Sequence, residues 1–146
     1  MSSTPTLQMA RPVVLSVEDD DTESYIIKIA VDECGVPADL HRVADGEQAL
    51  RFLRRTHGHE TAPRPHLILL DMSLPKKDGL EVLSEIRGTE SLRSIPVVIF
   101  TSSLREADRK KAIAFGADDC ISKPRTLTEL TDAIRSLCDR FLAEFR

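Results

Sequence analysis

The sequence predicts an α/β protein built on a doubly wound parallel sheet with helices on both faces. Apolar runs of strand length alternate with segments of helical period five times along the chain. Three of those runs, VVLSV, LILL and PVVIF, are apolar nearly throughout, which is typical of strands covered on both faces. The length of 146 residues fits one domain that needs neither disulfides nor a structural metal to fold.

Five strand and helix pairs follow one another in this pattern. The strands are expected at 13–17, 38–43, 66–70, 95–100 and 120–122. The helices are expected at about 21–34, 46–55, 80–87, 106–115 and from 127 onward. No internal repeat interrupts the order.

The helix assignments rest on the spacing of apolar residues along one face. In the first helix Ile26, Ile29, Ala30 and the pair Glu33 and Cys34 share a face; in the second the shared face is formed by Gly46, Ala49, Leu50 and Leu53. The last helix carries the clearest apolar stripe, made of Leu127, Leu130, Ile134, Leu137, Cys138 and Phe141.

Polar segments without a period border these elements. Residues 1–11 predict a disordered N-terminal arm, and residues 12–146 predict the folded domain. The segment 56–65 is long, polar and proline-bearing, so it predicts a surface loop. Thr126, with Glu129 three residues later, predicts a capping box at the start of the last helix.

Composition excludes several classes of function. The formal charge of −4 argues against general binding to DNA or RNA, which requires an excess of lysine and arginine. No apolar run approaches the roughly 20 residues that cross a bilayer, and the N-terminus lacks a secretory signal. The three widely spaced cysteines, Cys34, Cys120 and Cys138, predict neither a disulfide framework nor a zinc site. We therefore expect a soluble, cytoplasmic protein without a membrane or DNA partner.

Polar side chains follow four of the five predicted strands, at the edge where parallel sheets bind their ligands. They are Glu18, Asp19, Asp20 and Asp21 after the first strand, Asp71 after the third, Thr101 at the fourth, and Ser122, Lys123 and Pro124 at the fifth. Converging carboxylates repel one another unless a cation lies among them or they take up protons. An all-oxygen set without histidine or cysteine favours Mg2+, and the spacing is not that of a calcium-binding EF-hand loop, although chemistry alone leaves calcium open.

Four motifs in this order resemble the receiver domains of two-component response regulators. They are VEDDD (17–21), LLDMSLPKKDGLEVL (69–83), PVVIFTSS (96–103) and ISKP (121–124), so the resemblance runs from about Pro12 to the last helix. It implies a flavodoxin-like fold with strand order 2-1-3-4-5. The phrases DGEQALRFL, LPKKDG and IPVVIFTSS are most similar to free-standing receivers that serve phytochrome-type histidine kinases.

The resemblance also implies a role for each site residue. Asp71 corresponds to the phosphoacceptor, Thr101 to the hydroxyl that turns toward the phosphoryl group, and Lys123 to the lysine that pairs with a phosphoryl oxygen. The implied Mg2+ ligands are Asp19 and Asp71 directly, Glu18 through water and the backbone carbonyl of Ser73. The bond from Lys123 to Pro124 is expected to be cis, and Gly79 is expected to permit a positive φ in the turn after Asp71.

Two positions depart from the family pattern. Glu18 stands where aspartate is more usual. Cys120 stands where receivers usually carry Tyr or Phe, a ring that moves as the threonine turns. Cysteine is too small for that movement, so we expect the signal to leave through the backbone of the loop 102–106 and Cys120 to be a buried, ordinary thiol rather than a redox sensor.

Each of these residues alone has a plain structural explanation. Asp19 and its neighbours could merely cap a helix, Asp71 could be a structural carboxylate, and Thr101 and Lys123 are ordinary strand and surface residues. Their coincidence at four ends of one sheet favours a functional site. In contrast, His57, His59 and Glu60 are expected to be solvated loop residues, and the cationic residues Arg105, Arg109, Lys110 and Lys111 an exposed helix face with a weaker claim to a partner.

The function expected is a phosphorylation switch that accepts a phosphoryl group from a sensor histidine kinase and catalyses only its own phosphorylation and dephosphorylation. About 20 residues follow Thr126, all assigned to the last helix, so output is expected through an unidentified downstream protein, a phosphorelay, or use as a phosphate sink. Phe141 and Phe145 also suggest a homodimer through the helices at 106–115 and from 127. A phosphorylation-independent interaction module and an aspartyl phosphohydrolase are the alternatives. The second resembles D-x-D at the end of the first strand, whereas the phosphoacceptor candidate in this chain follows the third strand and reads Asp71, Met72, Ser73.

Overall fold

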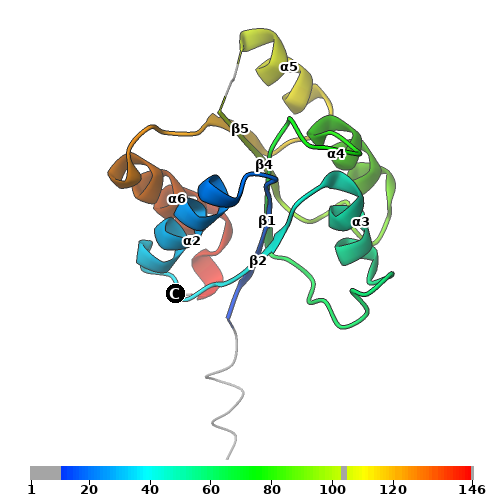
Figure 1. The fold of residues 1–146 in the computed structure, drawn as a ribbon, viewed down its shortest axis with the longest axis horizontal. Coiled ribbons are helices and arrows are strands. Elements are labelled where there is room, and N and C mark those ends of the chain that lie inside the picture. Colours follow the sequence, from blue (N-terminus) through cyan, green and yellow to red (C-terminus); the bar gives the residue numbers. More distant parts are fainter. Residues whose placement is uncertain (1–10, 103–104, 146) are drawn as a thin grey trace, which may run out of the picture.

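The computed structural model describes residues 11–102 and 105–145, which form a five-stranded parallel sheet between two layers of helices (Figure 1). The strands are β1 (Val13–Val17), β2 (Asp39–Val43), β3 (Leu67–Leu70), β4 (Val97–Thr101) and β5 (Asp119–Ser122). Their order is β2-β1-β3-β4-β5, as expected. The helices are α2 (Asp21–Glu33), α3 (Gly46–Arg54), α4 (Gly79–Gly88), α5 (Glu106–Ala114), α6 (Leu127–Phe141) and the short 3-10 helix η1 (Ala143–Phe145).

The core lies on both faces of the sheet. Every residue of β1, β3 and β4 is buried, which confirms the interpretation of their apolar runs. Helices α2 and α6 pack over one face, and α3, α4 and α5 lie over the other (Figure 1). One apolar cluster fills each face of the sheet, and the polar residues lie at the carboxyl ends of the strands.

The buried face of α2 differs from the expected one. Ile27, Ala30, Val31 and Cys34 are buried, whereas Glu33 is exposed and Ile26 and Ile29 are only partly covered. The observed buried face is rotated relative to the predicted one because both apolar sides of this helix have neighbours. One side packs on the sheet, and the other borders a groove next to α6.

Two expectations about local conformation are also corrected. Gly79 does not adopt a positive φ; the positive φ in this turn, 70°, belongs to Lys76. Within residues 11–102 and 105–145 no peptide bond is cis, so the bond before Pro124 is trans, the form that X-Pro bonds favour by about 0.5–1 kcal/mol.

The capping predictions are half confirmed. Thr126 Oγ1 accepts a hydrogen bond from Glu129 N at 3.1 Å, but the Glu129 carboxylate contacts the Thr126 hydroxyl instead of its backbone N–H. The complete capping box lies at α4, between Asp78 and Glu81. It anchors the helix that follows the turn after Asp71.

The two chain ends complete the description. Residues 1–10 of the predicted arm lie outside the described residues, and Arg11, the last of that segment, forms an ion pair with Asp39 at 3.0 Å. Helix α6 ends at Phe141, and η1 brings the Phe145 ring edge-on to His66, with 4.7 Å between centroids. None of the described helices has the length and apolar character to cross a membrane.

Candidate metal and phosphoacceptor site

The site lies at the carboxyl ends of β1 and β3, where the sheet's hydrogen bonding continues one residue past each strand. Glu18 N donates to Val43 O at 3.0 Å, and Asp71 N donates to Val17 O at 3.2 Å. These bonds hold both backbones in register. The side chains of Glu18 and Asp71 therefore start from fixed points on neighbouring strands.

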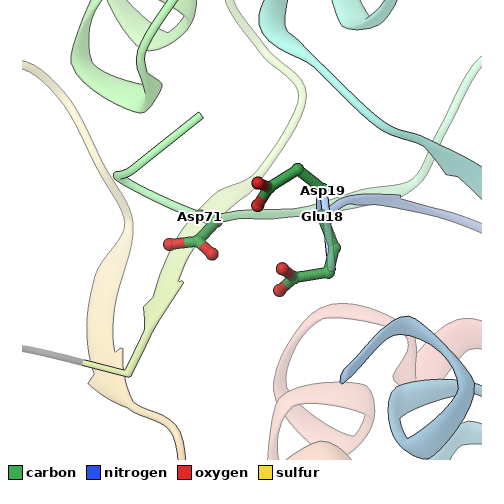
Figure 2. A group of neighbouring side chains, drawn as sticks. All are labelled: Glu18, Asp19 and Asp71. Carbon is green, nitrogen blue, oxygen red and sulfur yellow. The ribbon is translucent and has the colours of Figure 1, made fainter. Parts of the chain in front are cut away.

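Three carboxylates gather at this point. One oxygen from each of Glu18, Asp19 and Asp71 lies within 4.8 Å of the others, and the groups surround one space (Figure 2). Glu18 is 1% exposed and Asp71 7%, whereas Asp19 is exposed. The group therefore has a buried floor and a side open to solvent.

Lys123 extends from the end of β5 into the same cluster. Its Nζ contacts Glu18 Oε1 and lies 3.2 Å from Asp71 Oδ2 and 3.3 Å from Glu23 Oε1. The backbone N–H of Lys123 donates to Thr101 O at 2.7 Å, which ties the lysine to the end of β4. The Lys123 ammonium thus offsets part of the negative charge of Glu18, Asp71 and Glu23.

Burial and charge act in opposite directions on these two groups. Burial raises the pKa of Glu18 above its usual value, and the hydrogen bond from Lys123 only partly opposes this effect. Burial alone would lower the pKa of Lys123, but the Glu18 hydrogen bond and the Asp71 charge outweigh it and raise that pKa. The lysine is therefore held in its charged form.

Two residues that sequence reasoning missed help to build the site. Glu23, in the first turn of α2, is the third carboxylate at Lys123. Arg42, on the edge strand β2, donates from Nε to Glu18 O at 2.9 Å and from Nη1 to Asp21 Oδ1 at 2.8 Å. The sequence feature that could have pointed to Arg42 is a cationic side chain within a short edge strand. Its partners lie 24 and 21 residues away, so no local pattern could name them.

The turn after Asp71 is shaped by close packing. Ser73 N donates to Asp71 Oδ1 at 3.3 Å, and Gly79 N donates to Met72 O at 2.9 Å. A Cβ on Gly79 would lie 2.2 Å from Asp71 O, so this position needs glycine for close approach. The structure thus places Ser73 beside Asp71, while its carbonyl as a metal ligand stays a prediction.

Thr101 and Cys120 lie on the neighbouring strands β4 and β5, and Cys120 is part of the apolar core. Thr101 is buried at the end of β4, and Cys120 is fully buried on β5. Burial raises the pKa of the Cys120 thiol, which disfavours the reactive thiolate and agrees with the expected ordinary thiol. Of the loop 102–106 proposed to carry the signal, residues 103 and 104 lie outside the described part of the chain.

The weaker candidates remain apart from this site. Within the described ranges, Glu18, Asp19 and Asp71 are the only group with metal-binding geometry, and it does not include His57, His59 or Glu60. His59 packs against Phe52 instead, at 5.7 Å between centroids. The cationic residues of α5 are exposed, and Arg109 donates to Cys120 O.

The donor set fits a hard divalent cation. It consists of carboxylate oxygens without nitrogen or sulfur donors, and one of its members is open to solvent. Mg2+ commonly uses few carboxylates and keeps several waters, which suits such a half-open group.

An apolar groove of about 340 Å³ borders the acidic group between α2 and α6. Its lining includes Ile26, Ile29, Leu127 and Leu130, and Glu23 and Lys123 form its wall on the side of the site. Leu127 is 42% exposed. The groove and the acidic group therefore share a boundary.

Comparison with known proteins gives consistent matches over most of the chain. Response regulator Rcp1 from Synechocystis is 36% identical over 125 residues, which cover 86% of this chain and 85% of that protein. The structure of the phosphorylated cyanobacterial phytochrome response regulator RcpA superposes with a TM-score of 0.86 at 34% identity, covering 92% and 96% of the two chains. The Mn2+-bound form of Rcp1 gives a TM-score of 0.80 at 35% identity, covering 88% and 92%. The response regulator receiver domain model matches residues 14–135, and the chain belongs to this family of two-component signalling proteins.

Proposed function

We propose that this chain is a phosphorylation switch in which Asp71 accepts a phosphoryl group from a sensor histidine kinase in a Mg2+-dependent reaction. One observation carries the proposal. The buried carboxylate of Asp71 lies within 4.8 Å of Glu18 and Asp19 oxygens and 3.2 Å from the Lys123 ammonium. The phosphorylated state of the relative RcpA and the Mn2+-bound form of the relative Rcp1 support it.

Asp19, Asp71 and, through water, Glu18 would hold the Mg2+, with the Ser73 carbonyl as a further ligand. When bound, Mg2+ offsets the charge of the incoming phosphoryl oxygens. An Asp71 oxygen is the nucleophile and attacks phosphorus, while the donor's histidine nitrogen leaves. Lys123 pairs with a phosphoryl oxygen, and the Thr101 hydroxyl turns to donate to another. The protein acts on no separate substrate and catalyses only formation and hydrolysis of its own aspartyl phosphate.

The acceptor assignment is tested with acetyl phosphate and Mg2+. The wild-type chain should gain one acid-stable, base-labile phosphoryl group, and Asp71→Asn should gain none. Asp132→Asn, which changes an exposed carboxylate on α6, is the matched control and should be labelled like the wild type. Equal labelling of Asp71→Asn at the same site count would exclude Asp71 as the acceptor.

The metal ligands are tested by Mg2+ titration without phosphate. Asp19→Asn should weaken Mg2+ binding severalfold, because it removes one of few charged ligands. Asp32→Asn, on the far part of α2, should leave the affinity unchanged. Equal affinity in the wild type and Asp19→Asn would contradict the ligand set.

The groove between α2 and α6 supports a protein as the phosphoryl donor. Since it shares Glu23 and Lys123 with the acidic group, a helix seated there would bring a donor histidine to the rim of the site. Leu127→Asp should therefore slow transfer from a cognate kinase, whereas labelling by acetyl phosphate, which needs no docking, should persist. If both donors lose activity equally, the groove is not the kinase contact.

Domain extent, location and output complete the proposal. Residues 12–146 would be the receiver domain, and the protein would act in the cytoplasm without DNA or membrane contact. Output would pass to another protein or a further histidine, with a homodimer through α5 and α6. Sedimentation showing a monomer at high concentration, with and without a phosphoryl mimic, would remove the homodimer.

A further inference from the structure

Two buried cysteines meet where α2 ends and α6 nears its end. Cys34 follows the last residue of α2, Cys138 lies in the last turn of α6, and their Sγ atoms are 3.7 Å apart although 104 residues separate them. Both side chains are 1% exposed. We propose that Cys34 and Cys138 form a redox-convertible pair, which a small disulfide such as oxidised glutathione joins into an intramolecular disulfide that locks α2 to α6.

The geometry requires only a short movement. A disulfide holds its sulfurs about 2.05 Å apart, so the present 3.7 Å must shorten by less than about 2 Å. Rotation of either side chain about its Cα–Cβ bond moves Sγ over such a distance. Backbone adjustment is also open at Cys34, because the next residue, Gly35, has a φ of +88° and space around it.

Access to the buried thiols passes through the end of α2. Arg135, on α6, holds this end by donating from Nε to Cys34 O at 3.3 Å and from Nη2 to Glu33 O at 3.4 Å. Helix ends fray more readily than helix interiors, and Cys34 lies at such an end. Arg135 therefore restrains the end of α2 and limits the rate of oxidation without taking part in the reaction.

The reaction balances with glutathione disulfide as oxidant. The Cys34 thiol loses its proton, and the thiolate attacks one sulfur of glutathione disulfide, which forms a mixed disulfide and releases one glutathione. The Cys138 thiolate then attacks the Cys34 sulfur and releases the second glutathione. Two thiols are oxidised, and one glutathione disulfide is reduced to two glutathiones.

The lock acts on the two helices that flank the site. The first turn of α2 carries Glu23, and α6 begins shortly after Lys123, so both helices start beside the acidic group. A cross-link at their far ends limits how far they can separate along the groove between them. Any effect on phosphotransfer from a kinase rests on the proposed function, whereas disulfide formation does not.

The test incubates the full wild-type chain with glutathione disulfide and counts thiols in denaturant. The count should fall from three to one, peptide mapping should identify Cys120 as the remaining thiol, and dithiothreitol should restore all three. Oxidation should raise the Tm by roughly 10 °C, because the bond closes a long loop in the unfolded chain. Three retained thiols, a stable glutathione adduct in the wild type or cross-linked chains would each overturn the proposal.

Three variants separate this mechanism from general thiol oxidation. Cys120→Ala, the matched control, should oxidise like the wild type and end with no thiol. Cys138→Ala should stop at a glutathione adduct on Cys34. Arg135→Ala should form the same disulfide severalfold faster, and an unchanged rate would show that Arg135 does not restrain the end of α2. Because the wild-type thiol count decides the main proposal, a variant that fails to fold leaves the test intact. Labelling of Asp71 by acetyl phosphate reports separately on the proposed function.

Discussion

The helices α5 and α6 flank the same edge strand, β5, but different forces hold them. Helix α6 buries Leu130, Thr131, Ile134, Leu137 and Cys138 against the sheet and α2. Helix α5 buries Ala112 alone. Its contact with β5 depends instead on Arg109, which donates to Cys120 O and lies 3.6 Å from Asp119. In Figure 1 α6 lies alongside α2, whereas α5 lies at the top of the view.

This difference predicts that α5 and α6 move to different extents when the protein changes state. Moving α6 would open an apolar core, which costs several kcal/mol. Moving α5 would expose little more than one alanine and exchange polar contacts for water. Since segments with few buried apolar contacts open at low free energy, we expect α5 to shift on signalling while α6 stays in place.

The largest expected contrast comes from the same substitution in both helices. Ile134→Ala in α6 should lower the free energy of unfolding by about 3 kcal/mol, because its side chain is 2% exposed and leaves a cavity. Ile113→Ala in α5 should change it by less than about 0.5 kcal/mol, because Ile113 is 46% exposed. Urea denaturation of both variants measures the difference. Equal losses would mean that α5 is held as firmly as α6.

The helix starts offer a second contrast. Thr126 caps α6 with its side chain, whereas Arg105 precedes α5 without a side-chain cap. Thr126→Ala should destabilise the protein by about 1 kcal/mol, and Arg105→Ser should stabilise it by a similar amount. Thermal unfolding should show shifts of opposite sign. A loss in Arg105→Ser would show that the arginine has a structural role of its own.

A smaller effect is expected from the polar link between α5 and β5. Arg109→Ala should cost no more than about 1 kcal/mol in global stability, because the side chain is half exposed. Hydrogen exchange should nevertheless speed up severalfold in α5 and stay unchanged in α6. Lys110→Ala is the control on the exposed side of the same helix. If its exchange increases as much, loss of charge rather than loss of the Cys120 contact is responsible.

The smallest effect concerns α4, which lies on the same face of the sheet as α5. A salt bridge between Arg54 and Glu85 connects α4 to α3. Lys77 and Arg54 donate to Glu85 at 2.7 and 3.0 Å, and the Lys77 hydrogen bond is the main reason that the pKa of Glu85 is lowered. A lowered carboxyl pKa contributes stability above its ordinary value of 4.5 and loses it as the pH falls through the folded value.

Glu85→Gln should therefore remove part of the loss of stability on acidification, by less than about 1 kcal/mol since the pair is partly exposed. Melting curves between neutral and acid pH, compared with those of Glu90→Gln on an exposed side chain, measure it. Identical pH profiles for Glu85→Gln and the wild type would show that the ion contacts contribute nothing.

Most of the fold and much of the site followed from local patterns. The strands β1, β3 and β4 were visible as apolar runs, and each helix began within a residue of its predicted start. The residues Glu18, Asp19 and Asp71 were singled out because they follow strands of one sheet, and the structure brings them together. Such predictions succeed because strand burial, helix period and strand order are properties of short segments and of chain direction.

What only the tertiary structure decided depends on contacts between distant segments. The rotation of α2 about its axis determined that Ile27 and not Ile29 enters the core, and it also brought Glu23 to Lys123. The packing of α2 on α6 brought Cys34 to Cys138, although the widely spaced cysteines had predicted no pairing. Period alone places a residue on a helix face, but the axial rotation and the approach of two helices are set by how both side-chain surfaces fit on the sheet.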